Sequence, residues 1–262
     1  MKLNLEIIPV DLLRRYCGRV KKTKRTAFEK LHDSELSIKT FSFYTSVSAV
    51  YSSKIEGENI ELDSFINYKR QGVKLKSDYT RKIDDLYNSY LLAQKKKLTP
   101  ANINMAHALL TKHILQKTKQ GTARKGNMFV VTRDGKIEYV AALPFHVPKE
   151  LNKLYADIKQ LLSTELTFNE VLYFASMIHL MFVKIHPFED GNGRTARLLE
   201  KWFMAKKLGA KAWFVQSEKY YYKKHKTYYN NIRSLGMEYE TLDYSKALPF
   251  LFMLPEAISY KD

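Results

Sequence analysis

The sequence is poor in cysteine and has no long uninterrupted apolar run. Cys17 is the sole cysteine, which excludes a disulfide within the chain and predicts a reducing compartment. Residues 1–10 lack a charged segment followed by a long apolar one, so no signal peptide is expected. The longest apolar stretch, residues 171–185, is interrupted by Ser176, His179 and Lys184 and looks too short to cross a bilayer. We therefore expect a soluble, cytoplasmic protein without a membrane partner.

Acidic residues are also scarce relative to basic ones. Lysine and arginine number 44 against 27 aspartates and glutamates, which gives a formal net charge of +17. The lysines are scattered along the chain, as is typical of a solvated surface, although the same charge would suit a nucleic acid or another polyanion. A basic surface also attracts nucleoside triphosphates, so the net charge does not separate these classes of partner.

The chain is rich in residues that build a folded core. Apolar residues make up 45% of the 262 residues and aromatic ones 13%, which predicts a globular protein. The dominant apolar spacing is that of amphipathic helices. We expect a mainly α protein, with an N-terminal arm or short helices over residues 1–40 and a single domain over 41–262. Its helices are expected at residues 43–57, 62–72, 78–92, 99–114, 147–161, 167–185, 192–209 and 217–234.

The helix expected from Thr167 is the most apolar of the chain. Thr167-Phe168-Asn169-Glu170 matches a capping box, in which the first and fourth side chains bond each other's backbone N–H groups. Because the helix is apolar almost all round, it should be the central, buried one. It ends at His186, since Pro187 cannot extend it.

Residues 121–145 differ in kind from the rest. Two runs of β-forming residues, 128–132 and 137–140, flank Arg133-Asp134-Gly135-Lys136, and Asp-Gly is a strong hairpin turn signal. A lone hairpin is marginally stable unless it packs on the body. It is either a structural element or an edge that accepts an extended peptide, through the residues Met128, Phe129, Val130 and Val131.

The helix over 43–57 ends with a misplaced charge. Gly57 is a plausible C-terminal stop, and Glu56 then lies in the last turn, where a carboxylate meets the negative end of the helix dipole. Either Glu56 is simply solvated, or it has a cationic partner elsewhere in the fold.

Residues 186–197 carry the clearest chemistry. Two glycines precede a helix that begins near Asn192, and free N–H groups at a helix N-terminus form an anion site. Arg194 and Arg197 lie three residues apart on one face of that helix. Asp190 can hold magnesium between phosphates, and His186 can take a proton. These residue types predict phosphate-transfer chemistry.

This stretch resembles the signature of the Fic family, His-Pro-Phe-x-Asp-Gly-Asn-Gly-Arg-x-x-Arg, at every fixed position. Other family features extend the resemblance. Ser52-x-x-x-Glu56-Gly57 is similar to the inhibitory-helix motif, and the hairpin after Gly121-x-x-Arg124 resembles the target-docking flap. Tyr228-Tyr229 resembles the aromatic pair beside the nucleoside. The implied fold is a helical Fic-type bundle around a central helix.

The resemblance implies transfer of AMP from ATP to a tyrosine, threonine or serine hydroxyl of a target protein. His186 would be the general base, and neighbouring arginines would disfavour its imidazolium form. Asp190 would bind Mg²⁺, and Phe188 would anchor the loop in the core. The α-phosphate would be held by Gly191, Asn192 and Gly193, and the β- and γ-phosphates by Arg194 and Arg197. Phosphate-transferring relatives have lysine in place of Gly193, so glycine favours AMP transfer.

The resemblance also implies autoinhibition. Glu56 would pair with Arg197 and block the γ-phosphate, and Ser52 would tie the inhibitory helix to its neighbours. Alternatives stay open: the resting activity could be removal of AMP, or transfer of another nucleotide or phosphate-containing group. A non-enzymatic nucleic-acid binder would instead use the tyrosines and lysines of 217–234 as a base-stacking surface, but no DNA-binding module is evident. Self-association is common in the family.

Overall fold

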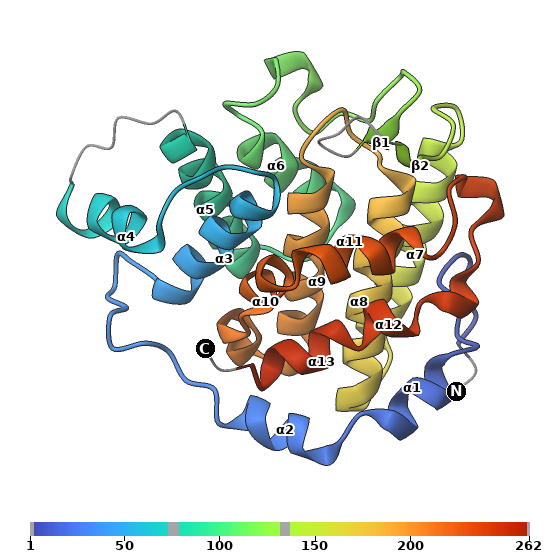
Figure 1. Cartoon of the computed structure of the whole chain (residues 1–262), viewed down its shortest axis with the longest axis horizontal. Coiled ribbons are helices and arrows are strands. Elements are labelled where there is room, and N and C mark those ends of the chain that lie inside the picture. The colour runs from blue at the N-terminus through green and yellow to red at the C-terminus, as the bar shows by residue number, and fades with distance from the viewer. Residues whose placement is uncertain (1–2, 73–78, 132–136, 261–262) are drawn as a thin grey trace.

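The computed structural model describes residues 3–72, 79–131 and 137–260, which form a mainly helical fold (Figure 1). A small antiparallel hairpin is inserted among the helices. The elements are α1 (Leu13–Arg19), α2 (Lys22–Glu29), α3 (Phe43–Ile55), α4 (Leu62–Gln71), α5 (Tyr79–Lys95), α6 (Pro100–Leu110), β1 (Phe129–Val131), β2 (Ile137–Val140), α7 (Val147–Ser163), α8 (Phe168–Ile185), α9 (Asn192–Leu208), α10 (Ser217–Lys223), α11 (His225–Arg233), α12 (Leu248–Leu251) and α13 (Met253–Ile258). Four short 3₁₀ turns join them, at residues 117–119, 210–214, 239–241 and 244–246.

Helix α8 lies at the centre, as predicted. The hydroxyl of Thr167 accepts from the backbone N–H of Glu170, and the Glu170 carboxylate accepts from the backbone N–H of Thr167 at 2.7 Å, so the predicted capping box is present. Every residue from 171 to 185 is buried. Helix α9 runs beside α8 for most of its length (Figure 1), and the remaining helices surround this pair. The predicted mainly α fold around a central buried helix is confirmed.

Within the described residues, α8 is the one helix whose 18 residues match a membrane span in length and composition. The expectation that the apolar stretch is too short to cross a bilayer is therefore wrong on length alone. In the fold, however, 89% of the stretch is buried by other parts of the protein, as in a core helix. The cytoplasmic location stays a prediction.

The helices around the α8–α9 pair form distinct groups. α3, α5 and α6 pack together on the α9 side, α7 packs on α8, and α10 to α13 cross the front of the pair in Figure 1. The N-terminal segment is also attached, because backbone N–H groups of residues 6, 7 and 8 donate to the buried Asp157 carboxylate of α7 at 2.6, 2.9 and 2.8 Å. Residues 1–40 thus include two short helices packed on the body, and the domain division at residue 41 stays a prediction.

Of the two hairpin strands, β2 has the expected bounds and β1 starts at Phe129, one residue later than expected. Residues 132–136, which include the expected turn, lie outside the described residues. β1 pairs with β2 in the register Phe129 to Val140 and Val130 to Tyr139, with a bulge after Val130. Tyr139 points into the core and is 4% exposed, whereas Phe129 is 56% exposed. The hairpin therefore packs on the body through one face and leaves apolar side chains on the other.

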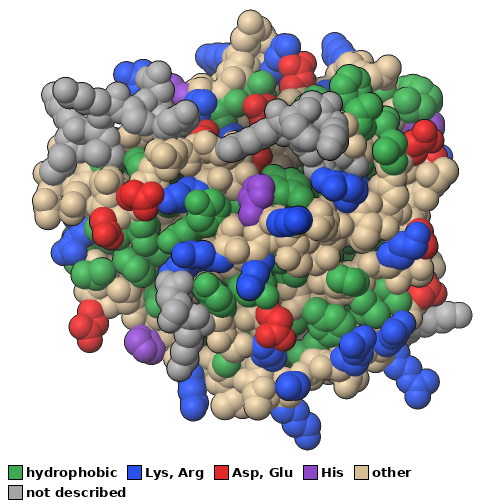
Figure 2. All heavy atoms as spheres, in the orientation of Figure 1, with side chains coloured by type: hydrophobic (Ala, Val, Ile, Leu, Met, Phe, Trp, Pro, Cys, Tyr) green, Lys and Arg blue, Asp and Glu red, His purple; other side chains and the backbone are tan. Residues whose placement is uncertain are grey.

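One expectation about the basic, tyrosine-rich region is wrong, and the expected scatter of basic side chains is seen. The stretch 217–234 is not one helix, because the chain leaves helical geometry at Lys224 and α11 starts anew at His225. No glycine or proline marks this break. Lysine and arginine side chains are scattered over the face shown in Figure 2 and not gathered into one stripe, which agrees with a solvated basic surface.

Candidate active site

The candidate active site lies where α8 ends and α9 begins. α8 ends at His186, which has φ 51° and ψ 61° and is the one non-glycine residue of positive φ among those described. Such a left-handed conformation costs free energy and is typical of functional sites. Gly191, at φ 77°, then caps α9. The turn between them places His186 beside the N-terminal end of α9.

Asn192 holds this turn in shape. Its Oδ1 accepts from the backbone N–H of Phe188 at 2.9 Å, and its Nδ2 donates to the Phe188 carbonyl at 2.8 Å. The Phe188 ring is buried and stacks on His107, with ring centroids 3.6 Å apart, which matches the expected anchoring role. Both polar ends of the Asn192 side chain are thus engaged, so it can serve a phosphate through its backbone N–H alone.

His107 supports the acidic end of the same turn. Its Nδ1 accepts from the backbone N–H of Gly121 at 2.9 Å, so the proton must be on Nε2, which donates to the Asp190 carbonyl at 2.9 Å. Burial lowers the pKa of His107 to about 4, which keeps the ring neutral. The backbone at Asp190 is therefore fixed from α6.

The Asp190 side chain itself is exposed and fits a magnesium site. Its Oδ1 accepts from the backbone N–H of Gly191 at 2.5 Å, and no cationic side chain pairs with it among the described residues. The described residues contain no cluster of three or more histidine, cysteine or acidic ligands. One carboxylate completed by phosphate oxygens and water is the usual environment of Mg²⁺ on a nucleotide.

His186 is half-buried and bonded through one nitrogen only. Its Nδ1 lies 2.9 Å from the Tyr139 hydroxyl and 3.2 Å from the Val183 carbonyl, while Nε2 makes no hydrogen bond within the described part of the chain. Burial, aided by the nearby Arg124, lowers the pKa of His186 to about 4, although the Val183 carbonyl and the Glu56 and Asp190 carboxylates oppose this. The expected neutral base is therefore supported, but the responsible cation is Arg124 and not an arginine of the motif.

Arg124 also holds the strained turn. Its Nε donates to the His186 carbonyl at 2.7 Å, and its backbone N–H donates to the Pro187 carbonyl at 2.9 Å. The two terminal nitrogens donate to the carbonyls of Gly126, at 2.6 Å, and Ala142, which lie at the two bases of the hairpin. One guanidinium thus joins the end of α8 to both ends of the flap (residues 121–145).

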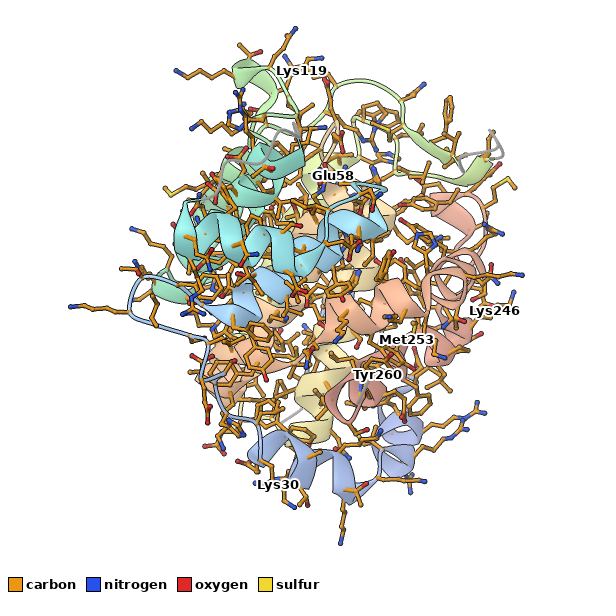
Figure 3. The ribbon with its side chains drawn as sticks, turned by 60° about the vertical axis from the view of Figure 1, so that its left-hand side comes forward. Lys30, Glu58, Lys119, Lys246, Met253 and Tyr260 are labelled. Atoms are coloured by element: carbon orange, nitrogen blue, oxygen red, sulfur yellow. The ribbon has the colours of Figure 1, made fainter. Side chains whose placement is uncertain are left out.

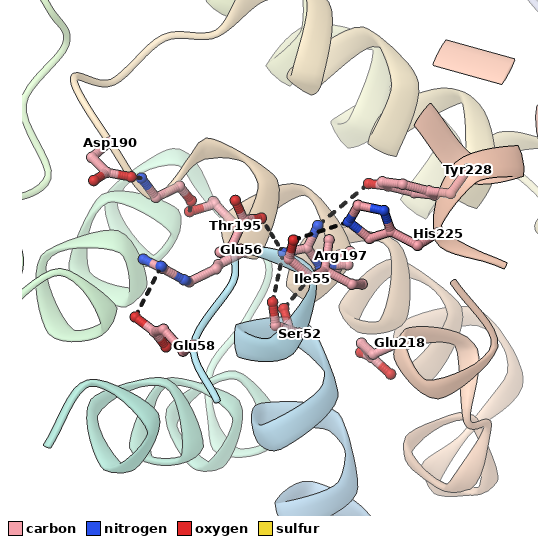
Figure 4. Close-up of polar contacts among 12 residues, drawn as sticks. Ser52, Ile55, Glu56, Glu58, Asp190, Thr195, Arg197, Glu218, His225 and Tyr228 are labelled. Atoms are coloured by element: carbon pink, nitrogen blue, oxygen red, sulfur yellow. Dashed lines mark hydrogen bonds and ion pairs between the residues drawn. The ribbon is translucent and has the colours of Figure 1, made fainter. Parts of the chain in front are cut away.

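Arg197 is fully enclosed by α3 and α11 (Figure 4). Its Nη2 lies 2.6 Å from Oε1 of Glu56 and 3.1 Å from the carbonyl of Ser52, and its Nε donates to the Ser52 hydroxyl at 2.8 Å. Its Nη1 lies 3.4 Å from the Tyr228 hydroxyl. The two residues of the inhibitory motif therefore both contact Arg197 directly.

The charge of Glu56 is stabilised at this place. Burial alone would raise the pKa of the Glu56 carboxyl, but the attraction of Arg197 and Arg194 and the hydrogen bond from Arg197 outweigh burial and lower it. Gly193 lets the carboxylate approach, because a Cβ at that position would lie only 2.5 Å from Oε1 of Glu56. The carboxylate thus lies against the first turn of α9, where a phosphate would bind.

Helix α3 is aligned along α9 by contacts at matching spacing. One turn before Ser52, the hydroxyl of Ser48 accepts from Nζ of Lys201 at 2.6 Å, and Lys201 is one turn after Arg197 on α9. Lys201 also pairs with Glu218 at 2.6 Å, and both side chains are fully buried. The contacts of Ser48, Ser52 and Glu56 therefore fix the register of the two helices.

The C-terminal end of α3 brings a second carboxylate to the site. The N–H of Gly57 donates to the Lys54 carbonyl and that of Glu58 to the Ser53 carbonyl, at 3.0 and 3.1 Å, which is the Schellman pattern, with Gly57 at φ 91°. Glu58 then lies 3.2 Å from Nη2 of Arg194. Figure 3 shows Glu58 inside the fold, whereas the labelled Lys119 and Lys30 lie at its periphery.

Arg194 is left with unused donors. Its Nε and Nη1 are buried and have no hydrogen-bond partner among the described residues. Buried N–H groups of a cation without partners are costly, and an anion would satisfy them. The first turn of α9 therefore has the properties of an incomplete phosphate site.

The expected aromatic pair beside the nucleoside is not arranged as predicted. Tyr228 is 1% exposed, and its hydroxyl lies 2.9 Å from Nε2 of His179 and 3.4 Å from Arg197, so its ring is not available to a base. Tyr229 is half-buried and keeps part of its ring exposed. Tyr221 is also buried, which removes much of the base-stacking surface proposed for a nucleic-acid binder.

Several residues of the site were missed by sequence reasoning. Glu58 follows Gly57 directly, and a Schellman end would have placed it beside Glu56. Arg124 was noted only as part of the Gly-x-x-Arg segment before the flap. Tyr139 and His107 carry no local signal of their contacts with the α8–α9 turn, because their partners are 47 and 83 residues away.

Comparisons with known proteins agree with this geometry. The sequence model of the Fic/DOC family matches residues 97–204. A protein adenylyltransferase Fic from Nematostella vectensis is 33% identical over 112 residues, which are 43% of this chain and 24% of that protein. The chain thus matches about a quarter of this relative, and the match supports no statement about the rest.

Solved Fic proteins share the fold at low sequence identity. A Fic family protein from Desulfovibrio desulfuricans superposes with a TM-score of 0.73 at 18% identity. The match covers 98% of this chain and 74% of that protein's chain. A Fic domain containing signaling protein from Bacteroides thetaiotaomicron has a TM-score of 0.67 at 16% identity, with coverages of 93% and 89%. Fic-1 from C. elegans also has a TM-score of 0.67, at 16% identity, with coverages of 95% and 70%.

The family match contains α6, the hairpin, the α8–α9 turn and most of α9, but it begins after α3. It therefore includes the motif at 186–197 and leaves the inhibitory contacts to be judged from geometry. With the motif complete and the helices arranged as in solved Fic proteins, residues 97–204 form a domain that matches the Fic/DOC family.

Proposed function

We propose that this protein transfers AMP from ATP to a hydroxyl side chain of a target protein. The observation that carries the proposal is the pairing of a neutral His186, with a free Nε2, and an N-terminal helix turn where Arg194 has two unpaired donors. A base beside an anion site is what attack of a hydroxyl on a phosphate requires. The adenylyltransferase name of the Nematostella vectensis relative supports the same reaction.

In the proposed step, the target hydroxyl gives its proton to Nε2 of His186 while its oxygen bonds to the α-phosphorus. The bond from that phosphorus to the oxygen bridging the β-phosphate breaks, and pyrophosphate leaves with the electron pair. The backbone N–H groups of Asn192 and Gly193 stabilise the charge on the α-phosphate, and Arg194 binds the leaving group. The products are an AMP phosphodiester on the target and an imidazolium that returns its proton to water.

Asp190 would hold Mg²⁺ against the α- and β-phosphates in this proposal. When bound, the ion neutralises part of the phosphate charge. Gly193 supports AMP transfer over phosphate transfer, because a lysine there could not coexist with the Glu56 carboxylate at its observed place. The exposed edge of the flap, with Phe129 and Val131, would meet the target. Self-association of the protein stays a prediction.

We further propose that the described conformation is autoinhibited. Glu56 occupies the nitrogen of Arg197 that would bind the γ-phosphate, while Nε and Nη1 of the same guanidinium donate to the hydroxyls of Ser52 and Tyr228. A charge-assisted pair of this kind is worth about 1.5–3 kcal/mol, which corresponds to about 10- to 150-fold in an equilibrium. ATP could bind without leaving this state, but its α-phosphate would not be presented for in-line attack.

Mass spectrometry of the Glu56→Gly protein, incubated with Mg²⁺ and a mixture of nucleotides, tests both proposals. We expect AMP on the protein itself, at a rate about 10- to 150-fold above wild type. Adding His186→Ala should abolish the transfer while ATP still binds. Glu61→Gln is the matched control, because Glu61 lies just after the same helix and its side chain is 73% exposed.

The outcomes separate the alternatives. Labelling of Glu56→Gly no greater than that of wild type refutes autoinhibition, and labelling that survives His186→Ala removes the assigned base. Attachment of UMP, GMP or phosphate would replace AMP as the transferred group. Release of AMP from a modified target by the wild-type protein would instead assign removal of AMP as its resting activity.

A further inference from the structure

The Val183 carbonyl is a helix carbonyl without its usual partner. In an α-helix this group would accept from the N–H four residues later, but that residue is Pro187, which has no N–H. Two side chains take its place: the Tyr139 hydroxyl lies 2.9 Å from the Val183 oxygen, and Nδ1 of His186 lies 3.2 Å from it. The same hydroxyl lies 2.9 Å from Nδ1, so the three groups form a closed triangle.

The hydrogens of this triangle can be assigned from the chemistry of its members. The carbonyl only accepts. If Nδ1 of His186 had no proton, the Tyr139 hydroxyl could satisfy either Nδ1 or the carbonyl, and the remaining two lone pairs would face each other at 3.2 Å. If Nδ1 carries the proton, the hydroxyl donates to Val183, and Nδ1 donates to the tyrosine oxygen. Only this second arrangement gives every group a partner, and so it is favoured.

We propose that Tyr139 is a positioning residue that fixes His186 in the tautomer protonated at Nδ1. The lone pair of Nε2, which has no partner within the described residues, is then kept for the hydroxyl of the target. Tyr139 reaches the reaction only through His186. The inference rests on the proposed function, because it concerns the group that would act as base.

Tyr139 is itself held in place by the body of the protein. Its side chain is 4% exposed, and Nζ of the buried Lys184 lies 4.3 Å from its ring centroid. The next residue, Val140, donates its N–H to the Met237 carbonyl at 2.7 Å. Tyr139 belongs to β2, one strand of the flap that would contact the target. The same strand therefore determines which ring nitrogen of His186 carries the proton.

Tyr139→Phe tests the inference, because it removes the hydroxyl and keeps the ring. In full-length protein labelled with ¹⁵N-histidine, long-range ¹H–¹⁵N correlation distinguishes a protonated from a bare ring nitrogen. The His186 signals are identified by their loss in His186→Ala. Near pH 7 the wild type should show a protonated Nδ1 and a bare Nε2. In Tyr139→Phe the Val183 carbonyl, 3.2 Å from Nδ1, still accepts from it, so both shifts should move only part of the way toward the average of the two tautomers.

Tyr155→Phe is the matched control. The Tyr155 hydroxyl is buried, has no hydrogen-bond partner within the described ranges, and lies in α7, away from the candidate site. Its removal should leave the His186 shifts unchanged. In the Glu56→Gly background, Tyr139→Phe should lower kcat about tenfold and leave KM for ATP within about twofold, whereas a loss of packing alone would not change the tautomer.

Two results would overturn the inference: unchanged His186 shifts in Tyr139→Phe, or a wild-type His186 protonated at Nε2. Shifts that move in a protein showing no AMP transfer in any background would refute the proposed function and leave the positioning role of Tyr139 standing. Failure of the proposed role of Tyr139 is therefore distinguishable from failure of the proposed AMP transfer.

Discussion

Replacing Glu58 by glutamine should strengthen ATP binding. Glu58 lies 3.2 Å from Nη2 of Arg194, and the two side chains are only 6% and 8% exposed. The β-phosphate of ATP would have to share Arg194 with this carboxylate. Glutamine keeps the shape of the side chain and removes its charge, so the phosphate would become the sole anionic partner of Arg194.

The expected size of the effect follows from the geometry of this pair. A hydrogen bond to a charged group contributes about 1.5–3 kcal/mol. The observed 3.2 Å exceeds the 2.7–2.9 Å of a strong charge-assisted bond, so we take about 1–2 kcal/mol, which is about 5- to 30-fold in Kd. Burial raises the pKa of Glu58, although Arg194 opposes this. The carboxylate therefore loses its charge at a higher pH than an ordinary glutamate does, and the gain in affinity should shrink as the pH is lowered.

Titration calorimetry with Mg²⁺ and a non-hydrolysable ATP analogue measures this difference. Glu56→Gly and Glu56→Gly/Glu58→Gln are compared, so that the contact of Arg197 with Glu56 is absent from both. Glu61→Gln in the same background removes an equal charge from the surface and should leave Kd unchanged.

Equal dissociation constants at pH 8 would refute the competition of Glu58 with phosphate. Weaker binding after Glu58→Gln would refute it in another way, because the carboxylate would then be orienting Arg194 toward the nucleotide. A gain in affinity that does not shrink as the pH is lowered would contradict the assignment of the effect to the charge of Glu58.

Three further predictions follow from the contacts of the site. Ser52→Ala removes the partner of Nε of Arg197 and should raise labelling by AMP about three- to tenfold, less than Glu56→Gly does; equal or lower labelling than wild type contradicts this. The imidazole shifts of His186 should stay constant from pH 8 to pH 5, since its pKa is about 4; a midpoint near 6.5 would show an ordinary histidine. Asn192→Ala should cost about 1–3 kcal/mol of unfolding free energy and lower the urea midpoint, and an unchanged midpoint would exclude its structural role.

The junction of α8 and α9 could be predicted because its signals are local. Each signal acts on its own turn of backbone: the capping box at Thr167, the proline at Pro187 and the glycine at Gly191. The helix start, the helix end and the turn can therefore be predicted from neighbouring residues. The same holds for the hairpin strands and for Gly57, whose left-handed conformation ends α3.

The contacts between distant segments could not be predicted from the residues alone. The pair of Glu56 and Arg197 spans 141 residues and that of Glu58 and Arg194 spans 136. The first was expected only through resemblance to a family, and the second was missed. The spacing of apolar residues also could not predict that Tyr228 faces His179 in the core. Tyrosines occur on both the buried and the exposed faces of such a helix, so the sequence pattern does not show which of them are buried.

The alignment of α3 along α9 has a consequence for how activity could be controlled. Val47, Ala49 and Val50 of α3 are buried, so the helix cannot leave the body without unfolding the protein. Under the proposed inhibition, activity therefore depends on local opening of its final turn, where the N–H groups of Gly57 and Glu58 are bonded. The ratio of wild-type to Glu56→Gly rates would equal the population of molecules with that turn open. Amide hydrogen exchange at these two residues should then change in parallel with basal activity as temperature rises.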